Sequence, residues 1–397
     1  ENHFLSLTIN NNLVQLFLLI FVHFQRRQRN VQVVVFPVME LLSRLLFICF
    51  LSSAGCKAGG FKTKNQAAIF ELKSGNLSIK VTNYGAHLIS LLYPDKNGKL
   101  DDVILGYDTI KEYMQDNSAL GATLGRVSNR IANASFTLNG TTYKLEANEG
   151  NNTLHSGSRG FNKVLWKVKE YLPNAKIPRL ILYYNSFDGE QGFPGDLRVS
   201  VSYRLLGDNK MSIRMAAKAL NKATPVNVVQ HPYWNLGGHA SGDILSEEIQ
   251  IFASKYTPTD AHLIPTGAIV PVKGTPYDFL APRIIGSRVG ELPFGYDVNY
   301  ALDGERSSKE MSMAAVVYDK KTGRRMELMT NKPGVQFYSG KFLNTTGKGG
   351  VLYKPFAGLA LETQGFPNAV NQPNFPSQIV YPGQTYKHYM AMKFYAH

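Results

Sequence analysis

The stretch "LRVSVSYRLLGDNKMSIRMAAKA" (residues 197–219) contains two runs of alternating apolar and polar residues, separated by a short polar segment. Alternation with period two is typical of a β-strand that buries one face, whereas a helix repeats its apolar residues every three or four positions. The separating segment "LGDNK" (206–210) carries the glycine, aspartate and asparagine that favour tight turns. The stretch therefore predicts an antiparallel hairpin.

The same period recurs along the chain. Three further stretches alternate in this way: "LSIKV" (77–81), "FTLNGTTYKL" (136–145), with a turn at Asn139-Gly140, and "AAVVYDKKTGRRMELMT" (314–330), with a turn at Thr322-Gly323. Only "DTIKEYMQDN" (108–117) reads as a short helix. We therefore expect an all-β fold, a large antiparallel β-sandwich with few short helices.

Composition favours a packed, folded chain. Of the 397 residues, 44% are hydrophobic and 18% are charged, so a substantial core can form. No Pro- or Ser-rich linker divides the chain after about residue 60, so residues 58–397 are expected to form a single domain. The net charge of +14 comes from scattered basic residues, and the densest cluster, "QRRQRN" (25–30), lies outside this domain. Nucleic-acid binding is therefore disfavoured.

The first 57 residues differ from the rest. From Met39 the sequence has Arg44, an apolar run at 45–51 and then small residues, which is the layout of a secretory signal peptide. We expect translation to start at Met39, cleavage within 53–60 and a secreted product without stable membrane insertion. The alternatives are a membrane anchor made of both apolar runs and a cytoplasmic protein. Five N-x-S/T triplets fit secretion weakly: Asn76, Asn133, Asn139, Asn151 and Asn344.

Several kinds of chemistry are excluded by missing residues. Both cysteines, Cys49 and Cys56, precede the domain, so the domain has no disulfide, thiolate metal site or cysteine nucleophile. The spacing of His231 from His239 and His262 is not that of a helical zinc motif. Phosphate-binding and serine-hydrolase motifs are also missing. We expect neither metal nor cofactor.

Polar residues stand inside several apolar or turn-like stretches of the domain: Arg126, Asn129, Arg130, His155, His231, Asp297, Gln336 and Glu362. Each alone has an ordinary explanation, because a carboxylate in a strand usually faces solvent and a lone histidine is usually structural. Together they supply guanidinium, imidazole, carboxylate and amide groups. Such a set suits the hydroxyls of a neutral polyol, and neighbouring aromatic rings suit its apolar faces.

Five stretches resemble, in order, the signature segments of the aldose 1-epimerases, also called galactose mutarotases. They are "GRVSNRIANASFTLNGTTYKLEANEGNNTLHSG" (125–157), "VVQHPYWNLGG" (228–238), "GYDVNYALD" (295–303), "PGVQFYSGKFL" (333–343) and "LALETQGFPNAVNQPNFPS" (359–377). The likeness covers about residues 81–388 and none of the first 57. It implies the galactose mutarotase-like super-sandwich, in agreement with the period-two pattern.

The resemblance also implies a reaction, which is the interconversion of the α and β anomers of free hexoses such as glucose and galactose. Glu362 would remove the proton of the C1 hydroxyl, His231 would protonate the ring oxygen, and His155 would support the ring oxygen or a neighbouring hydroxyl. This scheme needs an ionised Glu362 and a protonated His231, facing each other across a sugar-sized cleft. The sugar-binding residues implied by the resemblance are Asn129, Arg130, Asp297, Gln336 and the pocket residue Tyr233.

Two other functions remain open. One is a sugar-binding module without catalysis, although binding alone would not require an acid–base pair. The other is an epimerase of sugar phosphates, which should present further arginines beyond Arg126 and Arg130. We expect a small-molecule monosaccharide substrate and a monomer or weak dimer.

Overall fold

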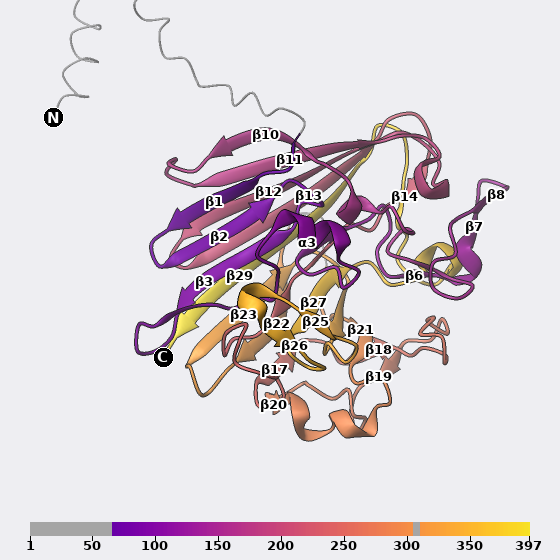
Figure 1. The fold of residues 1–397 in the computed structure, drawn as a ribbon. Coiled ribbons are helices and arrows are strands. Elements are labelled where there is room, and N and C mark those ends of the chain that lie inside the picture. Colours follow the sequence, from indigo (N-terminus) through magenta and orange to yellow (C-terminus); the bar gives the residue numbers. More distant parts are fainter. Residues whose placement is uncertain (1–65, 305–309) are drawn as a thin grey trace, which may run out of the picture. The chain divides into compact units, whose positions relative to one another are not determined.

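The computed structural model describes residues 66–304 and 310–397, all of which belong to one compact unit, Thr63–His397. The predicted leader (1–57) lies outside the described residues. The expected all-β architecture is confirmed, and the paired strands of every ladder run antiparallel (Figure 1).

The largest sheet has nine strands, and its longest members run side by side through the molecule (Figure 1). In spatial order the strands are β10 (Lys167–Leu172), β11 (Arg179–Ser186), β12 (Leu197–Gly207), β13 (Lys210–Ala219), β29 (Thr385–Ala396), β23 (Arg324–Thr330), β22 (Ser312–Tyr318), β17 (Glu248–Ile251) and β20 (Arg283–Ile284). The predicted hairpins at 197–219 and 314–330 are β12–β13 and β22–β23. Gly207, Asp208 and Asn209 all have positive φ, which explains the residue types at the first turn.

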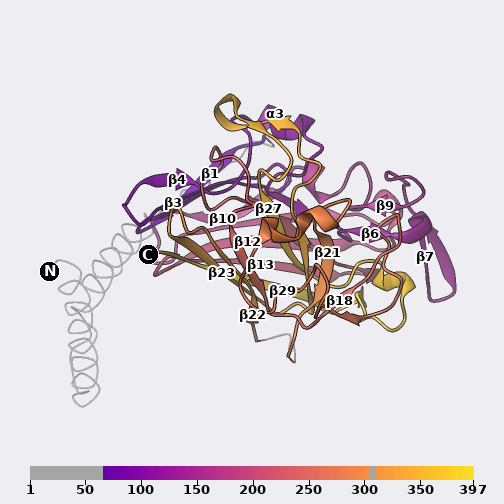
Figure 2. The ribbon, with the colours of Figure 1, turned by 90° about the horizontal axis from the view of Figure 1, so that it is seen from below.

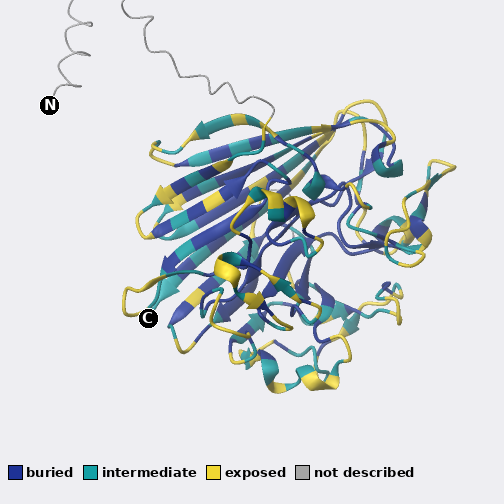
Figure 3. Cartoon of the chain, viewed as in Figure 1, coloured by how far each residue is buried: buried dark blue, intermediate teal, exposed yellow. Residues whose placement is uncertain are grey.

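Burial follows the alternation of the sequence. Val199, Val201, Ile213 and Met215 are fully buried, whereas the residues between them are mostly more exposed. Figure 3 shows this alternation as dark and light bands along the strands. One face of the sheet therefore forms the core, as the period-two pattern predicts.

Two further sheets contribute to the same core cluster. The six-stranded sheet runs β16 (Tyr233–Trp234), β27 (Leu359–Gln364), β24 (Gly334–Tyr338), β21 (Asp297–Ala301), β18 (Lys255–Thr257) and β19 (Val270–Pro271). The four-stranded sheet runs β1 (Ile69–Ser74), β2 (Leu77–Thr82), β3 (Leu88–Pro94) and β4 (Leu100–Asp102). Leu72 and Ile79 from the smaller sheet, and Phe337 and Leu361 from the larger one, join the inward side chains of the nine-stranded sheet.

In the part of the chain that the structure describes, five further sheets consist of only two short strands each. They are β5 (Ala122–Leu124) with β15 (Val229–His231), β6 (Arg130–Ile131) with β9 (Thr153–Leu154), β7 (Ser135–Leu138) with β8 (Thr141–Lys144), β14 (Thr224–Pro225) with β28 (Ile379–Val380), and β25 (Thr345–Thr346) with β26 (Leu352–Tyr353). The β7–β8 hairpin is the predicted one, and both turn residues, Asn139 and Gly140, have positive φ.

Helices are few and short. The predicted helix is α3 (Ile110–Gln115), which begins at a capping box between Thr109 and Glu112. It lies beside the β25–β26 loop, where the backbone N–H of Gly349 donates to Asp108 (Figure 2). The other helical segments are single 3₁₀ turns: η1 (Ala132–Ala134), η2 (Phe161–Lys163), η3 (Glu190–Gly192), η4 (Ile285–Ser287), η5 (Val289–Glu291), η6 (Lys348–Gly350) and η7 (Ala369–Asn371). Within the described residues, no helix has the length and apolar character needed to cross a bilayer.

Candidate active site

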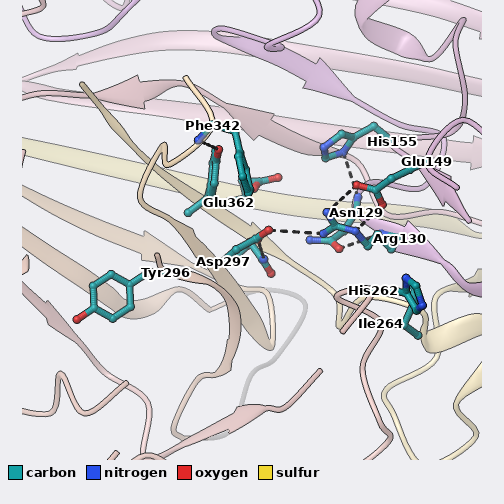
Figure 4. Close-up of polar contacts among 12 residues, drawn as sticks. Asn129, Arg130, Glu149, His155, His262, Ile264, Tyr296, Asp297, Phe342 and Glu362 are labelled. Atoms are coloured by element: carbon teal, nitrogen blue, oxygen red, sulfur yellow. Dashed lines mark hydrogen bonds and ion pairs between the residues drawn. The ribbon is translucent and has the colours of Figure 1, made fainter. Parts of the chain in front are cut away.

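A cavity of about 590 Å³ opens where the short strand pairs meet the six-stranded sheet. This volume lies within the usual range for small-molecule sites. All but one of the predicted site residues line it: Asn129, Arg130, His155, His231, Tyr233, Asp297 and Glu362. The exception is Gln336. Residues more than 200 positions apart in the sequence thus share one wall (Figure 4).

Strand register brings His231 and Glu362 together. Tyr233 and Trp234 of β16 pair with Ala360 and Leu359 of β27. Continuing that antiparallel register past Pro232 sets His231 opposite Glu362. Their side chains are in direct contact, with 3.4 Å between His231 Nε2 and Glu362 Oε1. The expectation that a sugar-sized cleft separates the two is therefore wrong.

Both side chains of this pair are deeply buried, at 5% and 3% relative exposure. Each also keeps one polar atom, His231 Nδ1 or Glu362 Oε2, without a hydrogen-bond partner. Buried polar atoms nearly always have a partner in folded proteins. Two unpartnered polar atoms in one buried pair are therefore exceptional and set this pair apart from ordinary buried polar groups.

Burial sets the pKa values of the pair. It lowers the pKa of His231 to about 4. It also raises the pKa of Glu362 well above the usual value, helped by nearby Asp297 and opposed by Arg130. Both shifts favour uncharged side chains. The expected ionised Glu362 with a protonated His231 is therefore not the state that burial favours in this cavity.

His155 approaches the pair from a turn after β9. Its Nδ1 accepts a hydrogen bond of 3.2 Å from the backbone N–H of Asn129, and its ring meets that of His231 edge-on at 5.7 Å between centroids. Burial, His231 and Arg130 together lower the pKa of His155 well below the usual value. His155 is therefore neutral and carries its proton on Nε2.

The backbone around this turn is unusual. Asn129, His155 and Ser156 all have positive φ, which is uncommon for residues with a side chain. The side chain of Ser156 ties the turn down, because its hydroxyl accepts from the N–H of Val127 and donates to the carbonyl of the same residue. Strained backbone of this kind often occurs at functional sites.

Arg130 lies between two carboxylates (Figure 4). Its Nε and Nη2 donate to Glu149 at 2.6 and 2.8 Å, and its Nη1 is 3.7 Å from Asp297 Oδ2. Burial opposes the charge of Arg130, but the bond to Glu149 and the charge of Asp297 raise its pKa overall. Burial raises the pKa of Asp297, although Arg130 opposes this shift.

Gln336 does not line the cavity but contacts a residue that does, Asp297. Its Nε2 donates to Asp297 Oδ1 at 2.6 Å, and its Oε1 accepts from Gln364 at 3.3 Å. Gln364 also donates to Asn299. The amide that the resemblance assigned to the sugar is thus engaged in holding Asp297, within a layer of hydrogen bonds across β21, β24 and β27.

Sequence reasoning missed several lining residues. Tyr338 packs edge-on against Tyr233, with 6.0 Å between ring centroids, and Glu149, His262 and Phe342 complete parts of the wall. Tyr338 lies two positions after Gln336 on β24. Residues two apart on a strand share a face, so this pattern could have predicted Tyr338 as a lining residue. Glu149 belongs to the same quoted stretch as His155. Phe342 likewise belongs to the signature stretch 333–343, whereas no signal in the sequence pointed to His262.

Arg126, in contrast, is structural. Its guanidinium donates to the carbonyls of Pro194, Gly195 and Phe187 and to the hydroxyls of Thr224 and Ser186. It is 2% exposed and is not among the residues that line the cavity. No group of three potential metal ligands occurs among residues 66–304 and 310–397.

Comparisons with known proteins find relatives over most of the chain. Residues 68–393 match the family model of the aldose 1-epimerases. The chain is 42% identical to the galactose mutarotase of Sus scrofa over 322 residues, which cover 80% of this chain and 91% of that protein. It is 34% identical to the aldose 1-epimerase of Escherichia coli K12 over 331 residues, which cover 81% of this chain and 93% of that protein.

A solved structure shows the same fold. The aldose epimerase homologue from C. elegans matches with a TM-score of 0.78 at 28% identity, covering 83% of this chain and 99% of that one. The family match spans most of the chain and includes every predicted site residue. This protein therefore belongs to the aldose 1-epimerase family.

Proposed function

We propose that the protein interconverts the α and β anomers of free hexoses such as glucose and galactose, with Glu362 as general base and His231 as general acid. The observation that carries the proposal is the buried 3.4 Å contact between these two side chains on a cavity wall. Membership of the aldose 1-epimerase family supports the reaction type.

The short separation suits the substrate. The two oxygens that exchange protons during anomer interconversion, the C1 hydroxyl and the ring oxygen, are both bonded to C1. An acid and a base that serve them must therefore be neighbours. The pair His231–Glu362, with 3.4 Å between Nε2 and Oε1 and both residues lining the cavity, meets this requirement.

The proposed steps are as follows. Glu362 takes the proton of the C1 hydroxyl while His231 gives a proton to the ring oxygen, the bond between C1 and the ring oxygen breaks, and an open-chain aldehyde forms. Rotation about the C1–C2 bond presents the other face of the aldehyde. The same proton transfers in reverse then close the ring as the other anomer.

The remaining residues bind and orient the sugar. His155 donates from Nε2, since its Nδ1 already accepts from Asn129. Arg130 and Asp297 offer a donor and an acceptor to hydroxyls, and the ring of Tyr233 offers a flat apolar face. Gln336 acts through Asp297, which it holds at 2.6 Å.

The contacts disfavour both alternatives. A module that only binds sugars would not need two uncompensated titratable groups in contact, because burying them costs stability. A sugar-phosphate epimerase needs free arginines. Arg126 is engaged in the fold and Arg130 is held by Glu149.

Polarimetry of freshly dissolved α-D-glucose and α-D-galactose tests the proposal, with the uncatalysed rate subtracted. Glu362→Gln keeps the shape but removes the base, so kcat should fall by about 10²–10⁴-fold at an unchanged melting temperature. Glu247→Gln is the matched control, because Glu247 is a buried carboxylate outside the cavity, and it should retain activity. Wild-type activity retained by Glu362→Gln would refute the assignment. Tight sugar binding without any acceleration by the wild type would favour the binding module.

We also propose that the segment from Met39 directs secretion and is cleaved within 53–60. The support is its composition, with Arg44 before an apolar run and small residues after it. N-terminal sequencing of the protein recovered from the culture medium of its source should begin within or just after that window. Recovery from the cytoplasm with residues 39–57 intact would contradict the proposal.

A further inference from the structure

Glu149 holds the guanidinium of Arg130 with two hydrogen bonds, from Nε at 2.6 Å and from Nη2 at 2.8 Å. The side chain of Glu149 is 35% exposed, compared with 10% for Arg130, so Glu149 is the outer partner of this pair. Figure 4 shows Glu149 on one side of Arg130 and Asp297 on the other. Paired bonds of this geometry are the ones that an arginine otherwise makes to a carboxylate or phosphate ligand.

The charges of the cavity wall make this contact significant. Among the described residues that line the cavity, Arg130 is the only lysine or arginine. Three acidic residues line the same cavity: Glu149, Asp297 and Glu362. The two lining histidines near Arg130, His155 and His231, have pKa values lowered by burial, so they add no positive charge at neutral pH. The wall around Arg130 is therefore neutral or negative.

We propose that Glu149 restricts this enzyme to uncharged aldoses by occupying the two donors with which Arg130 would bind an anionic sugar and by cancelling its charge. The inference rests on the function proposed above and specifies the substrate class of the same site. Arg130 keeps its other N–H groups for neutral hydroxyls. For a uronate or a sugar phosphate, in contrast, the positive charge of Arg130 is already paired with the carboxylate of Glu149.

The test compares D-glucuronate with D-glucose, which differ in charge at C6. Replacing Glu149 with glutamine preserves one hydrogen-bond acceptor and removes the negative charge. In Glu149→Gln, the ratio of kcat/KM for glucuronate to that for glucose should rise about tenfold, because Glu149 is only partly exposed and its charge acts on a nearby anion through a dielectric below that of water. Glu170→Gln breaks a similar pair, with Arg179 on the nine-stranded sheet, and should leave the ratio unchanged. An unchanged ratio in a folded Glu149→Gln would overturn the inference.

A second measurement uses the unmodified protein and so decides the matter even where the variant does not fold. The side chain of Glu149 reaches solvent, at 35% exposure, and salt screens the repulsion between charges that reach solvent. The glucuronate-to-glucose ratio of the wild type should therefore increase with ionic strength. A ratio that does not change with salt would overturn the inference. A wild type inactive on every aldose would instead refute the proposed function, so the two failures are distinguishable.

Discussion

At the scale of single residues, the His231–Glu362 contact decides how the site titrates. The two groups are 3.4 Å apart and buried, so they share protons as a coupled pair and not as independent groups. The same number of protons can be arranged in this pair in two ways. In the first form the histidine is neutral and the glutamate is protonated, and in the second form the histidine is protonated and the glutamate is ionised. Burial favours the first form, whereas the reaction proposed here uses the second. Hydrogen bonds to a bound sugar and the charge of Arg130 would favour the second.

The dependence of activity on pH follows from this pair. At pH values below the His231 pKa of about 4, both groups carry protons and no base remains. Above the raised pKa of Glu362, both have lost their protons and no acid remains. We therefore expect a bell-shaped profile of kcat/KM for D-glucose, with its acid limb near pH 4 and its alkaline limb well above the usual glutamate pKa.

Polarimetry across the pH range measures this profile, with the buffer-catalysed rate subtracted at each pH. An acid limb at the ordinary histidine pKa would contradict the role of burial. In His231→Asn most of the activity should be lost, and the remaining activity should no longer show the acid limb near pH 4.

At the scale of elements, strand register explains which polar residues meet. Residues two positions apart on a strand point to the same face of the sheet. This spacing relates Asp297 to Asn299 on β21 and Glu362 to Gln364 on β27, and Gln336 lies on β24 between these two strands. The pairs Asn299↔Gln336 and Gln336↔Glu362 are directly opposite. The polar layer beneath the cavity is thus a consequence of pairing between adjacent strands.

Two arginines close in the sequence, Arg126 in the loop after β5 and Arg130 at the start of β6, have different roles, which a matched pair of variants separates. Arg126→Lys loses the planar fork that joins Pro194, Gly195, Thr224, Ser186 and Phe187, so we expect it to lower the free energy of unfolding by about 3 kcal/mol. Arg130→Lys keeps the charge in the cavity but loses the paired bonds to Glu149. It should raise KM for D-glucose about tenfold with little change in stability.

Denaturant unfolding and polarimetry on both variants measure these effects. The outcome expected is a split, with stability lost in Arg126→Lys and substrate affinity lost in Arg130→Lys. Equal loss of stability in both would mean that Arg130 is as structural as Arg126.

At the scale of the whole molecule, the site exists because several sheets end at one place. The β6–β9 pair supplies Arg130 and leads into His155, β15 supplies His231, and the six-stranded sheet supplies Asp297 and Glu362. The large sheets contribute the rigid core beneath. A cavity built on paired strands keeps its polar groups at fixed distances, as general acid–base catalysis requires.

The sequence alone determined the class of the fold, its hairpins, its single α-helix among the described residues and the chemical types in the site. These features depend on neighbours close in the chain, through period-two burial, turn residues with positive φ and the capping box at Thr109. Only the tertiary structure decided that His231 and Glu362 are in contact, that Arg126 belongs to the fold while Arg130 lines the cavity, and that Glu149 holds Arg130. The physical reason is that burial, charge pairing and the resulting pKa shifts are properties of the surroundings in space, and those surroundings come from strands far apart in the sequence.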